Sequence, residues 1–168
     1  MHQIEAHYDE FYGRITAWYR KDPARIKLLK QLNTANVAVF YAAYPILLII
    51  AFVTDNPKKW QILLVPAVSF VLLTMIRARI NRRRPYEDWN LDVLIAKDKQ
   101  GESMPSRHIF SSSVIAMAVM AVNVPLGIIL LILAASGGYF RIVGGVHYPS
   151  DVLAGFLLGI LSGLFIVL

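Results

Sequence analysis

Long uncharged stretches alternate with short charged segments along most of this chain of 168 residues. The uncharged stretches cover residues 31–54, 60–76, 109–140 and 152–168. A helix that crosses a bilayer needs about 20 mainly apolar residues, and the first, second and last stretches each fit one crossing. The pattern therefore predicts a bundle of membrane-spanning helices.

The stretch over residues 109–140 is too long for a single crossing. A helix of its 32 residues would be about 48 Å long. Asn123-Val124-Pro125 offers a break, because proline disfavours the helical conformation in the residue before it. We expect two helices here, over residues 107–123 and 125–143. The fold class predicted is an all-α integral-membrane bundle of about five transmembrane helices.

The first thirty residues have a different character. Aromatic and apolar side chains recur at helical spacing: Tyr8, Phe11, Tyr12, Ile15, Trp18 and Tyr19. Basic residues lie between and after them, which predicts an amphipathic helix at the membrane surface. Asp22-Pro23 is typical of a helix start and predicts a second short helix. The chain is thus divided into an N-terminal surface segment, 1–30, and a transmembrane core, 31–168.

Composition agrees with a membrane protein and narrows the chemistry. The chain is 57% hydrophobic, its mean hydropathy is +0.52 and its formal net charge is +6. In a membrane protein this positive charge favours anionic headgroups or a phosphorylated substrate, and no nucleic-acid partner is expected. The absence of cysteine excludes disulfides, thiolate chemistry and Cys-ligated zinc.

Two further segments leave alternatives open. The polar connection 85–105 is compatible with an interfacial segment over a site or with a plain loop. Gly155, Gly159 and Gly163 recur every four residues in the last helix. That spacing favours close packing between helices, and a seam between two copies in a homodimer stays open as the alternative.

Three clusters of polar residues flank the predicted spans: Arg77 with Arg84-Pro85, then Pro105-Ser106-Arg107-His108, then Arg141 with His147 and Asp151. With five alternating crossings, all three clusters fall on the same side of the membrane. Unrelated surface residues would not be expected to coincide in this way. We therefore expect one shared site.

The residue types in these clusters suit phosphate chemistry. Arginine presents a planar fork of donors that matches phosphate oxygens, and several arginines can stabilise the charge that a metal ion stabilises elsewhere. Two histidines can serve as nucleophile and proton donor, and Asp151 can orient a neighbouring imidazole. The residues alone leave open which histidine attacks, although the spacing to Asp151 favours His147. No metal or other cofactor is expected.

In order and spacing, the clusters resemble the three-part signature of the type 2 phosphatidic acid phosphatase superfamily, which shares its helical core with vanadium-dependent haloperoxidases. The signature spans Arg77 to Asp151. The resemblance implies that His147 is the nucleophile, Asp151 its orienting partner and His108 the general acid. It also implies a phosphate clamp, to which we assign Arg77, Arg84, Ser106, Arg107 and Arg141.

The chain departs from the family pattern at three positions. Arg77 stands where lysine is usual, Arg107 where glycine is usual, and Phe140 where serine often precedes the arginine. None of these changes removes the acid, the base or the nucleophile, so an active enzyme is expected. The family core usually has six crossings, and here the N-terminal surface helix takes the place of the first.

Basic residues predict the orientation in the membrane. The side that carries the N-terminus and the three clusters has fifteen of the 17 Lys and Arg, and the other side has only Lys58 and Lys59. Basic residues are enriched in cytoplasmic loops, so the catalytic face is predicted to be cytoplasmic in a multi-pass cell-membrane protein. Many bacterial relatives are expected to face outward instead.

The function predicted is hydrolysis of a phosphomonoester or pyrophosphate of a lipid through a phosphohistidine intermediate. Phosphatidylglycerophosphate, phosphatidate and a polyprenyl pyrophosphate are the substrates considered, since few residues lie outside the membrane. A haloperoxidase would need vanadate in the same pocket. A non-catalytic lipid-binding membrane protein on the same fold is the second alternative, and the intact His108, His147 and Asp151 argue against it.

Overall fold

The computed structural model describes residues 8–96 and 99–168, and within them the regular structure is entirely helical. The helices are α2 (Tyr8–Arg20), α3 (Pro23–Val53), α4 (Lys59–Ile80), α5 (Pro85–Asp88), α6 (Arg107–Met120), α7 (Val124–Val143) and α8 (Pro149–Val167). Residues 2 and 7, two histidines to which no role is assigned, lie outside the described part. The predicted all-α class is confirmed.

Five helices form the bundle, as predicted. By length and composition α3, α4, α7 and α8 can each cross a membrane, whereas α6 is a shorter apolar helix of 14 residues. At 1.5 Å per residue α6 is about 21 Å long, less than the hydrocarbon thickness. Nine of its residues are buried, because α7 and α8 pack closely along it. It is the central helix of the bundle and needs little contact with lipid.

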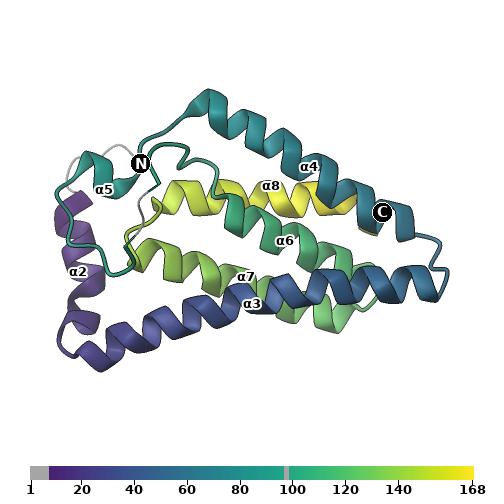
Figure 1. Cartoon of the computed structure of the whole chain (residues 1–168), viewed down its shortest axis with the longest axis horizontal. Helices are drawn as coiled ribbons and strands as arrows, with labels where there is room; N and C mark the ends of the chain where they lie inside the picture. Colours follow the sequence, from purple (N-terminus) through teal and green to yellow (C-terminus); the bar gives the residue numbers. More distant parts are fainter. Residues whose placement is uncertain (1–7, 97–98) are drawn as a thin grey trace.

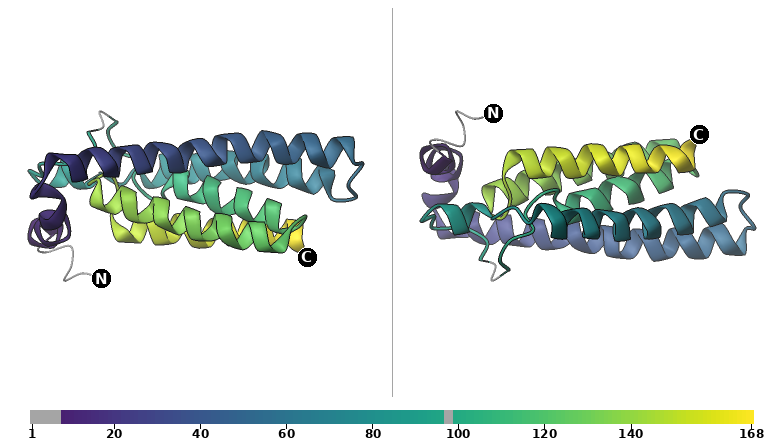
Figure 2. Two further views of the ribbon diagram at one scale, coloured as in Figure 1. Left: turned by 90° about the horizontal axis from the view of Figure 1, so that it is seen from below. Right: turned by 90° about the horizontal axis from the view of Figure 1, so that it is seen from above.

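The bundle has two layers. α3 and α4 form a helical hairpin, and α6, α7 and α8 pack together beside it (Figures 1 and 2). The turn between α3 and α4 reaches beyond the other helices at one end of the molecule (Figure 2). α2 lies across the opposite end, where residues 81–96 and 99–106 of the connection between α4 and α6 and the loop between α7 and α8 also lie (Figure 1).

The prediction of a second short N-terminal helix is wrong. Asp22 caps a helix as expected, since its side chain accepts a hydrogen bond from Ala24 N at 2.8 Å and Pro23 follows at the first position. That helix does not stop, however, and runs through the first predicted span to Val53. No helix-breaking residue separates the two parts. The expected boundary after residue 30 falls inside α3, and the division into two segments stays a prediction.

The amphipathic N-terminal helix is present as α2, and its inward face contacts protein. Tyr8, Tyr12 and Thr16, spaced one turn apart, are buried. Tyr12 Oη donates to the carbonyl of Val143 at 3.1 Å and accepts from Leu94 N at 3.2 Å. α2 therefore ties the end of α7 to the connection that follows α4.

The glycine repeat of α8 serves close packing within the chain. A Cβ at Gly155 would lie 2.5 Å from the Ser106 carbonyl oxygen, and one at Gly159 would lie 2.6 Å from that of Phe110. At Gly163 the nearest atom, Cβ of Met117, would be 2.2 Å away. The stripe thus faces α6, which brings the start of α8 against the start of α6. It no longer argues for a homodimer.

A proline in α4 is accommodated by the facing helix. Pro66 has no N–H to donate to the carbonyl of Ile62 one turn earlier. Tyr44 Oη of α3 lies 3.2 Å from that carbonyl and 3.3 Å from the carbonyl of Leu63. Its hydroxyl donates a hydrogen bond there instead of the missing N–H. A freed carbonyl inside a membrane needs such a partner.

The core lies between the layers, and much of the outer surface is apolar. Its buried residues are Phe40, Leu47, Ala51, Ile62, Ala116, Ala118, Val119, Leu130, Ala134 and Ile166. Large side chains such as Ile49 and Phe165 are exposed, 63% and 79% respectively. An exterior of this kind matches a lipid environment.

Candidate active site

Backbone hydrogen bonds bring the three sequence clusters together at the end of the bundle that α2 covers. Ser106 N donates to the carbonyl of Asp151 at 2.8 Å, which joins the start of α6 to the start of α8. Ser103 N donates to the carbonyl of Arg82 at 2.8 Å, which joins the end of α4 to the segment before α6. The three clusters therefore lie beside one another at one end of the bundle.

His147 lies in the loop between α7 and α8 and is 5% exposed. Its Nδ1 is 3.2 Å from Ser103 Oγ and 3.6 Å from Asp151 Oδ2. Ser103 Oγ donates to the same Asp151 Oδ2 at 2.5 Å. Hydrogen bonds therefore connect the imidazole to the carboxylate through Ser103, whereas the direct separation of 3.6 Å is beyond hydrogen-bond distance. With Nδ1–H directed to these oxygens, the lone pair of Nε2 is left for another partner.

Burial lowers the pKa of His147 to about 4, and the hydrogen bond to Asp151 offsets only part of this effect. Arg84 and Arg141 also favour the uncharged ring because their positive charges are close to it. The imidazole is therefore neutral at pH 7. A neutral ring with a free Nε2 is the form that can act as a nucleophile.

The Asp151 carboxylate is fully buried and has partners on both oxygens. Oδ2 accepts from Tyr148 N at 3.0 Å in addition to Ser103, and Oδ1 accepts from Arg82 Nη1 at 2.9 Å. The Arg82 guanidinium lies over the Tyr148 ring, 4.4 Å from its centroid, and also donates to Ser150 Oγ at 2.8 Å. These contacts fix the carboxylate and keep it ionised.

Sequence reasoning did not select Ser103 or Arg82. Ser103 stands just before the second cluster, and Arg82 lies in the basic run that ends at Arg84. A basic run beside a membrane helix is an ordinary topology signal, and an isolated serine in a loop carries no signal. Their contacts with Asp151 depend on how the segment between α4 and α6 folds, which the sequence pattern does not show.

Three arginines of the proposed clamp are buried, Arg77, Arg84 and Arg141, and the last two lie close to His147. Arg77 donates to the carbonyls of Pro105 and Glu102, and Arg84 donates to those of Gly101 at 3.0 Å and Val146 at 3.3 Å. Arg84 lies near enough to both Arg77 and Arg141 for like-charge repulsion. Holding these cations together is unfavourable unless an anion lies between them.

Two buried donors of the predicted clamp have no partner among the described residues, and Tyr8 Oη of α2 is a third such donor at this end of the bundle. The two clamp donors are Arg77 Nε and Ser106 Oγ, and Ser106 is fully buried. Leaving a buried donor unsatisfied costs about 1–3 kcal/mol, so such groups in a native structure call for a ligand or water. An oxyanion is the ligand that would satisfy the two clamp donors.

Arg107 and His108 face another direction. They lie on the first turn of α6 and line a cleft of about 570 Å³ between α3, α4 and α6. Arg107 does not lie in the buried group formed by Arg84, Arg141 and His147, because its side chain extends over Phe70, with Cζ 5.5 Å from the ring centroid.

Carboxylate and imidazole groups do not gather elsewhere in the described part of the chain. Within residues 8–96 and 99–168, no group of three or more His, Cys, Asp or Glu side chains has the arrangement of a metal site. The positive charges that converge at the site are those of arginines.

These features define a multi-pass helical membrane protein with a buried cationic site around a neutral histidine. The chain belongs to the PAP2 superfamily, whose family model matches residues 58–168. It is therefore a membrane-embedded phosphatase of the lipid phosphatase class.

Individual relatives agree with this assignment. The chain is 29% identical over 148 residues to the bacitracin transport permease protein BcrC of Bacillus licheniformis, covering 82% of this chain and 72% of that protein. Aquifex aeolicus LpxE has a similar structure, with a TM-score of 0.72 and 25% identity over 92% of this chain and 91% of the other. The PAP2-type phosphatidylglycerolphosphate phosphatase of Bacillus subtilis shares the fold, with a TM-score of 0.72 and 23% identity over 99% and 85% of the two chains.

Proposed function

We propose that this phosphatase hydrolyses a phosphomonoester or pyrophosphate of a membrane lipid through a phosphohistidine on His147. The observation that carries the proposal is the buried, neutral imidazole whose Nδ1 is held by Ser103 and Asp151, with the unpartnered donors of Arg77 and Ser106 at the same end of the bundle. Phosphatidylglycerophosphate, phosphatidate and polyprenyl pyrophosphate are the substrates we consider. The first is suggested by the name of the Bacillus subtilis structure, which shares the fold.

The reaction has two steps. In the first, the lone pair of His147 Nε2 forms a bond to phosphorus while the bond from phosphorus to the lipid oxygen breaks, and His108 donates a proton to that oxygen. In the second, His108 accepts a proton from water as its oxygen attacks the phosphohistidine, and the bond to Nε2 breaks. Inorganic phosphate leaves, and both histidines regain their first state.

The other residues stabilise charge in this scheme. Arg77, Arg84, Arg141 and the Ser106 hydroxyl donate to the phosphoryl oxygens, whose charge is spread over three positions in the transition state. Asp151 stabilises the positive charge that develops on His147 as it is phosphorylated, acting in part through Ser103. Phosphate release from a panel of detergent-solubilised lipid phosphates tests the proposal, because a non-catalytic lipid-binding protein releases none.

Activity should not depend on a divalent metal and should be inhibited by orthovanadate. Arginines supply the positive charge that a metal would supply, and vanadate bound to His147 would adopt the trigonal-bipyramidal geometry of the transition state. Phosphate release would be measured with EDTA, with EDTA followed by magnesium, and with millimolar vanadate. A loss in EDTA that magnesium restores, or full activity in vanadate, would contradict this site.

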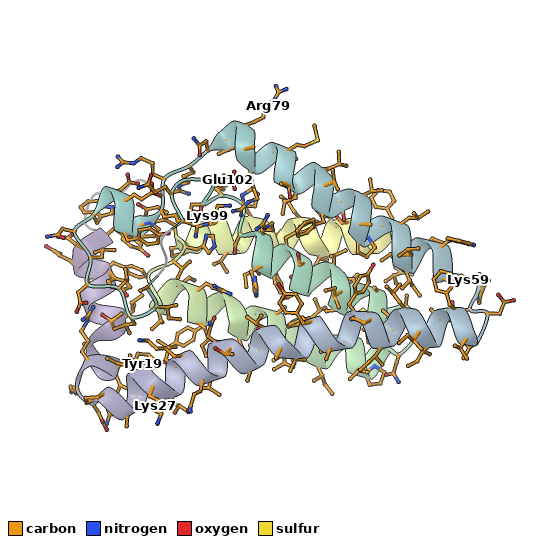
Figure 3. The ribbon with its side chains drawn as sticks, viewed as in Figure 1. Tyr19, Lys27, Lys59, Arg79, Lys99 and Glu102 are labelled. Carbon is orange, nitrogen blue, oxygen red and sulfur yellow. The ribbon has the colours of Figure 1, made fainter. Side chains whose placement is uncertain are left out.

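The catalytic end of the bundle should face the cytoplasm in a cell membrane. Arg79, Lys99 and Lys27 lie toward that end and Lys59 at the other (Figure 3), in line with fifteen basic residues against two. The chain has no cysteine, so single substitutions give a clean assay. The exposed Asn90 and Pro57 lie in the connections at the two ends.

In intact cells, Asn90→Cys should resist a membrane-impermeant thiol reagent and react after lysis, whereas Pro57→Cys should react in both conditions. The reverse pattern would make the site outward-facing and leave the proposed chemistry unchanged.

A further inference from the structure

The cleft beside the site is apolar along its length and cationic at one end. It runs between α3 and α4 on one side and α6 on the other, and is closed along its sides by residues such as Phe40, Pro45, Leu63, Pro66 and Ile115. On α6 it extends from Arg107 to Ile115, eight residues or about 12 Å. Its volume of about 570 Å³ is within the range of small-molecule sites.

Arg107 is the cation at that end, and no described residue neutralises it. Its guanidinium forms no hydrogen bond or ion pair with residues 8–96 or 99–168; it lies over the Phe70 ring and close enough to Arg77 for like-charge repulsion. Glu102 is close enough to interact electrostatically, but its carboxylate is bound to Lys99 Nζ at 2.6 Å. An unpaired guanidinium that lies beside an apolar cleft and close to a second arginine is unfavourable, so an anionic ligand is expected there.

The position of His108 indicates which part of the substrate supplies the anionic group that Arg107 binds. In the proposed reaction His108 protonates the oxygen that leaves, and it lines the same cleft as Arg107. His147, with the buried Arg84 and Arg141 around it, is not among the residues that line this cleft. Arg107 therefore lines the cleft of the leaving group beside Arg77, whereas Arg84 and Arg141 lie around His147, where the transferred phosphate binds.

We propose that Arg107 forms a second anion-binding subsite, which selects lipids whose leaving group retains a negatively charged phosphoryl group. The hydrocarbon chain of that leaving group occupies the cleft between α3, α4 and α6. The inference rests on the proposed function and extends it to a substrate class. That class has two chemical sources: a lipid diphosphate, which leaves as a lipid monophosphate, and a phospholipid that bears both a phosphodiester and a terminal phosphomonoester.

The test compares leaving groups of different charge in the full-length protein in detergent. The leaving group of phosphatidate is a neutral diacylglycerol. That of phosphatidylglycerophosphate is an anionic phosphodiester, and that of farnesyl diphosphate is a monophosphate. Arg107→Gln should lower kcat/KM about 10- to 100-fold for the anionic leaving groups, the range for a lost hydrogen bond to a charged group. The loss for phosphatidate should be at least about 5-fold smaller than for the anionic leaving groups, and an unchanged thermal unfolding midpoint shows that the variant is folded.

Two controls sharpen the test. Arg79→Gln removes an exposed arginine at the same end of the bundle and should leave all three substrates unaffected. Phosphatidylglycerol, which has no phosphomonoester to transfer, should inhibit the wild-type protein competitively and inhibit Arg107→Gln about 10-fold more weakly.

The outcomes separate the inference from the proposed function. A loss confined to one anionic substrate identifies the source of the second phosphoryl group and supports the subsite. Equal losses on all three substrates would overturn it and put Arg107 in the clamp for the transferred phosphate. No loss on any substrate would also overturn it. If the wild-type protein releases phosphate from none of the lipids, the proposed function itself fails.

Discussion

Replacing His147 with alanine should abolish hydrolysis of both a lipid phosphomonoester and p-nitrophenyl phosphate. A nucleophile must form its bond to phosphorus whatever group leaves, so we expect a loss of at least ~10⁴-fold on each substrate. The buried position of the ring, 5% exposed, gives water no equivalent position from which to replace it. Phosphate release by the purified variant in detergent is the measurement.

His108→Ala should show a different pattern. A general acid matters when the departing oxygen needs a proton, as a lipid alkoxide does, whereas p-nitrophenolate leaves readily without one. We expect a loss of ~10²-fold or more on the lipid and a much smaller loss on the aryl ester. Arg79→Gln, at an exposed position, serves as the control for expression and membrane insertion. Equal losses in the two histidine variants on both substrates would show that the roles are not divided in this way.

The second step offers an independent check of the same assignment. The residue that donated a proton to the lipid oxygen must accept one from the attacking water, by microscopic reversibility. His108→Ala should therefore accumulate phosphoenzyme after rapid quenching with the aryl ester, and His147→Ala should form none. Full activity in His147→Ala would refute the proposed mechanism as a whole.

The sequence was sufficient to predict the elements that depend on local rules. Charge-free runs marked the helices, and the Asn123 side chain, which accepts from Leu126 N at 3.0 Å, caps α7 after the expected break. Prediction from the sequence fails where contacts with neighbouring segments decide where a helix begins or ends. Residues 23–30 follow a helix start and precede a span; they contain no helix breaker after Pro23, but their charges suggested a boundary that the continuous helix does not have. α6 ends at Met120, before the expected residue 123.

In the candidate site, too, some features were predictable from the sequence and others were not. Spacing predicted that Arg84, His147 and Asp151 share one end of the bundle, and the structure brings them together. The direction of Arg107 was not predictable, because Ser106 Oγ and Arg107 are adjacent in sequence but lie on different faces of the α6 N-terminus. Ser106 is buried against the start of α8, and Arg107 lines the cleft on the side of α3 and α4. Helical geometry separates neighbours by about 100°, so one residue contacts protein and the next the cleft.

α2 adds a contribution that the family match does not include. The matched region begins at residue 58, yet Tyr8 packs edge-on against Tyr148, with ring centroids 4.8 Å apart, directly beside His147. Tyr12 bonds to the residue that ends α7. The loop that carries His147 is therefore enclosed by a helix whose sequence suggested only a surface anchor, which limits the freedom of the loop and the access of water.

Asp151→Asn should lower kcat on lipid and aryl substrates alike, by about 10³- to 10⁴-fold, as expected when an imidazole loses the carboxylate that sets its tautomer and stabilises its positive charge. Asp151 is ideally placed for this role, since it has Ser103, Tyr148 N and Arg82 as partners and is fully buried. Because the Asp151 charge raises the pKa of His147, its removal should lower that pKa further. The acid limb of kcat/KM set by His147, near pH 4 in the wild type, should then move to lower pH.

Ser103→Ala should give a smaller effect of the same kind. The direct distance from His147 Nδ1 to Asp151 Oδ2 is 3.6 Å, so the aspartate retains part of its influence when the bridging hydroxyl is lost. We expect about a 10-fold loss in kcat, the effect of one hydrogen bond, on both substrates. Ser150→Ala is the matched control, since Ser150 bonds to Arg82 and not to the imidazole. A merely structural role for Ser103 would change stability and leave the pH profile in place. If Ser103→Ala and Ser150→Ala lower kcat equally, or if Asp151→Asn retains wild-type kcat, the hydrogen bonds that link His147 to Asp151 through Ser103 have no part in the reaction.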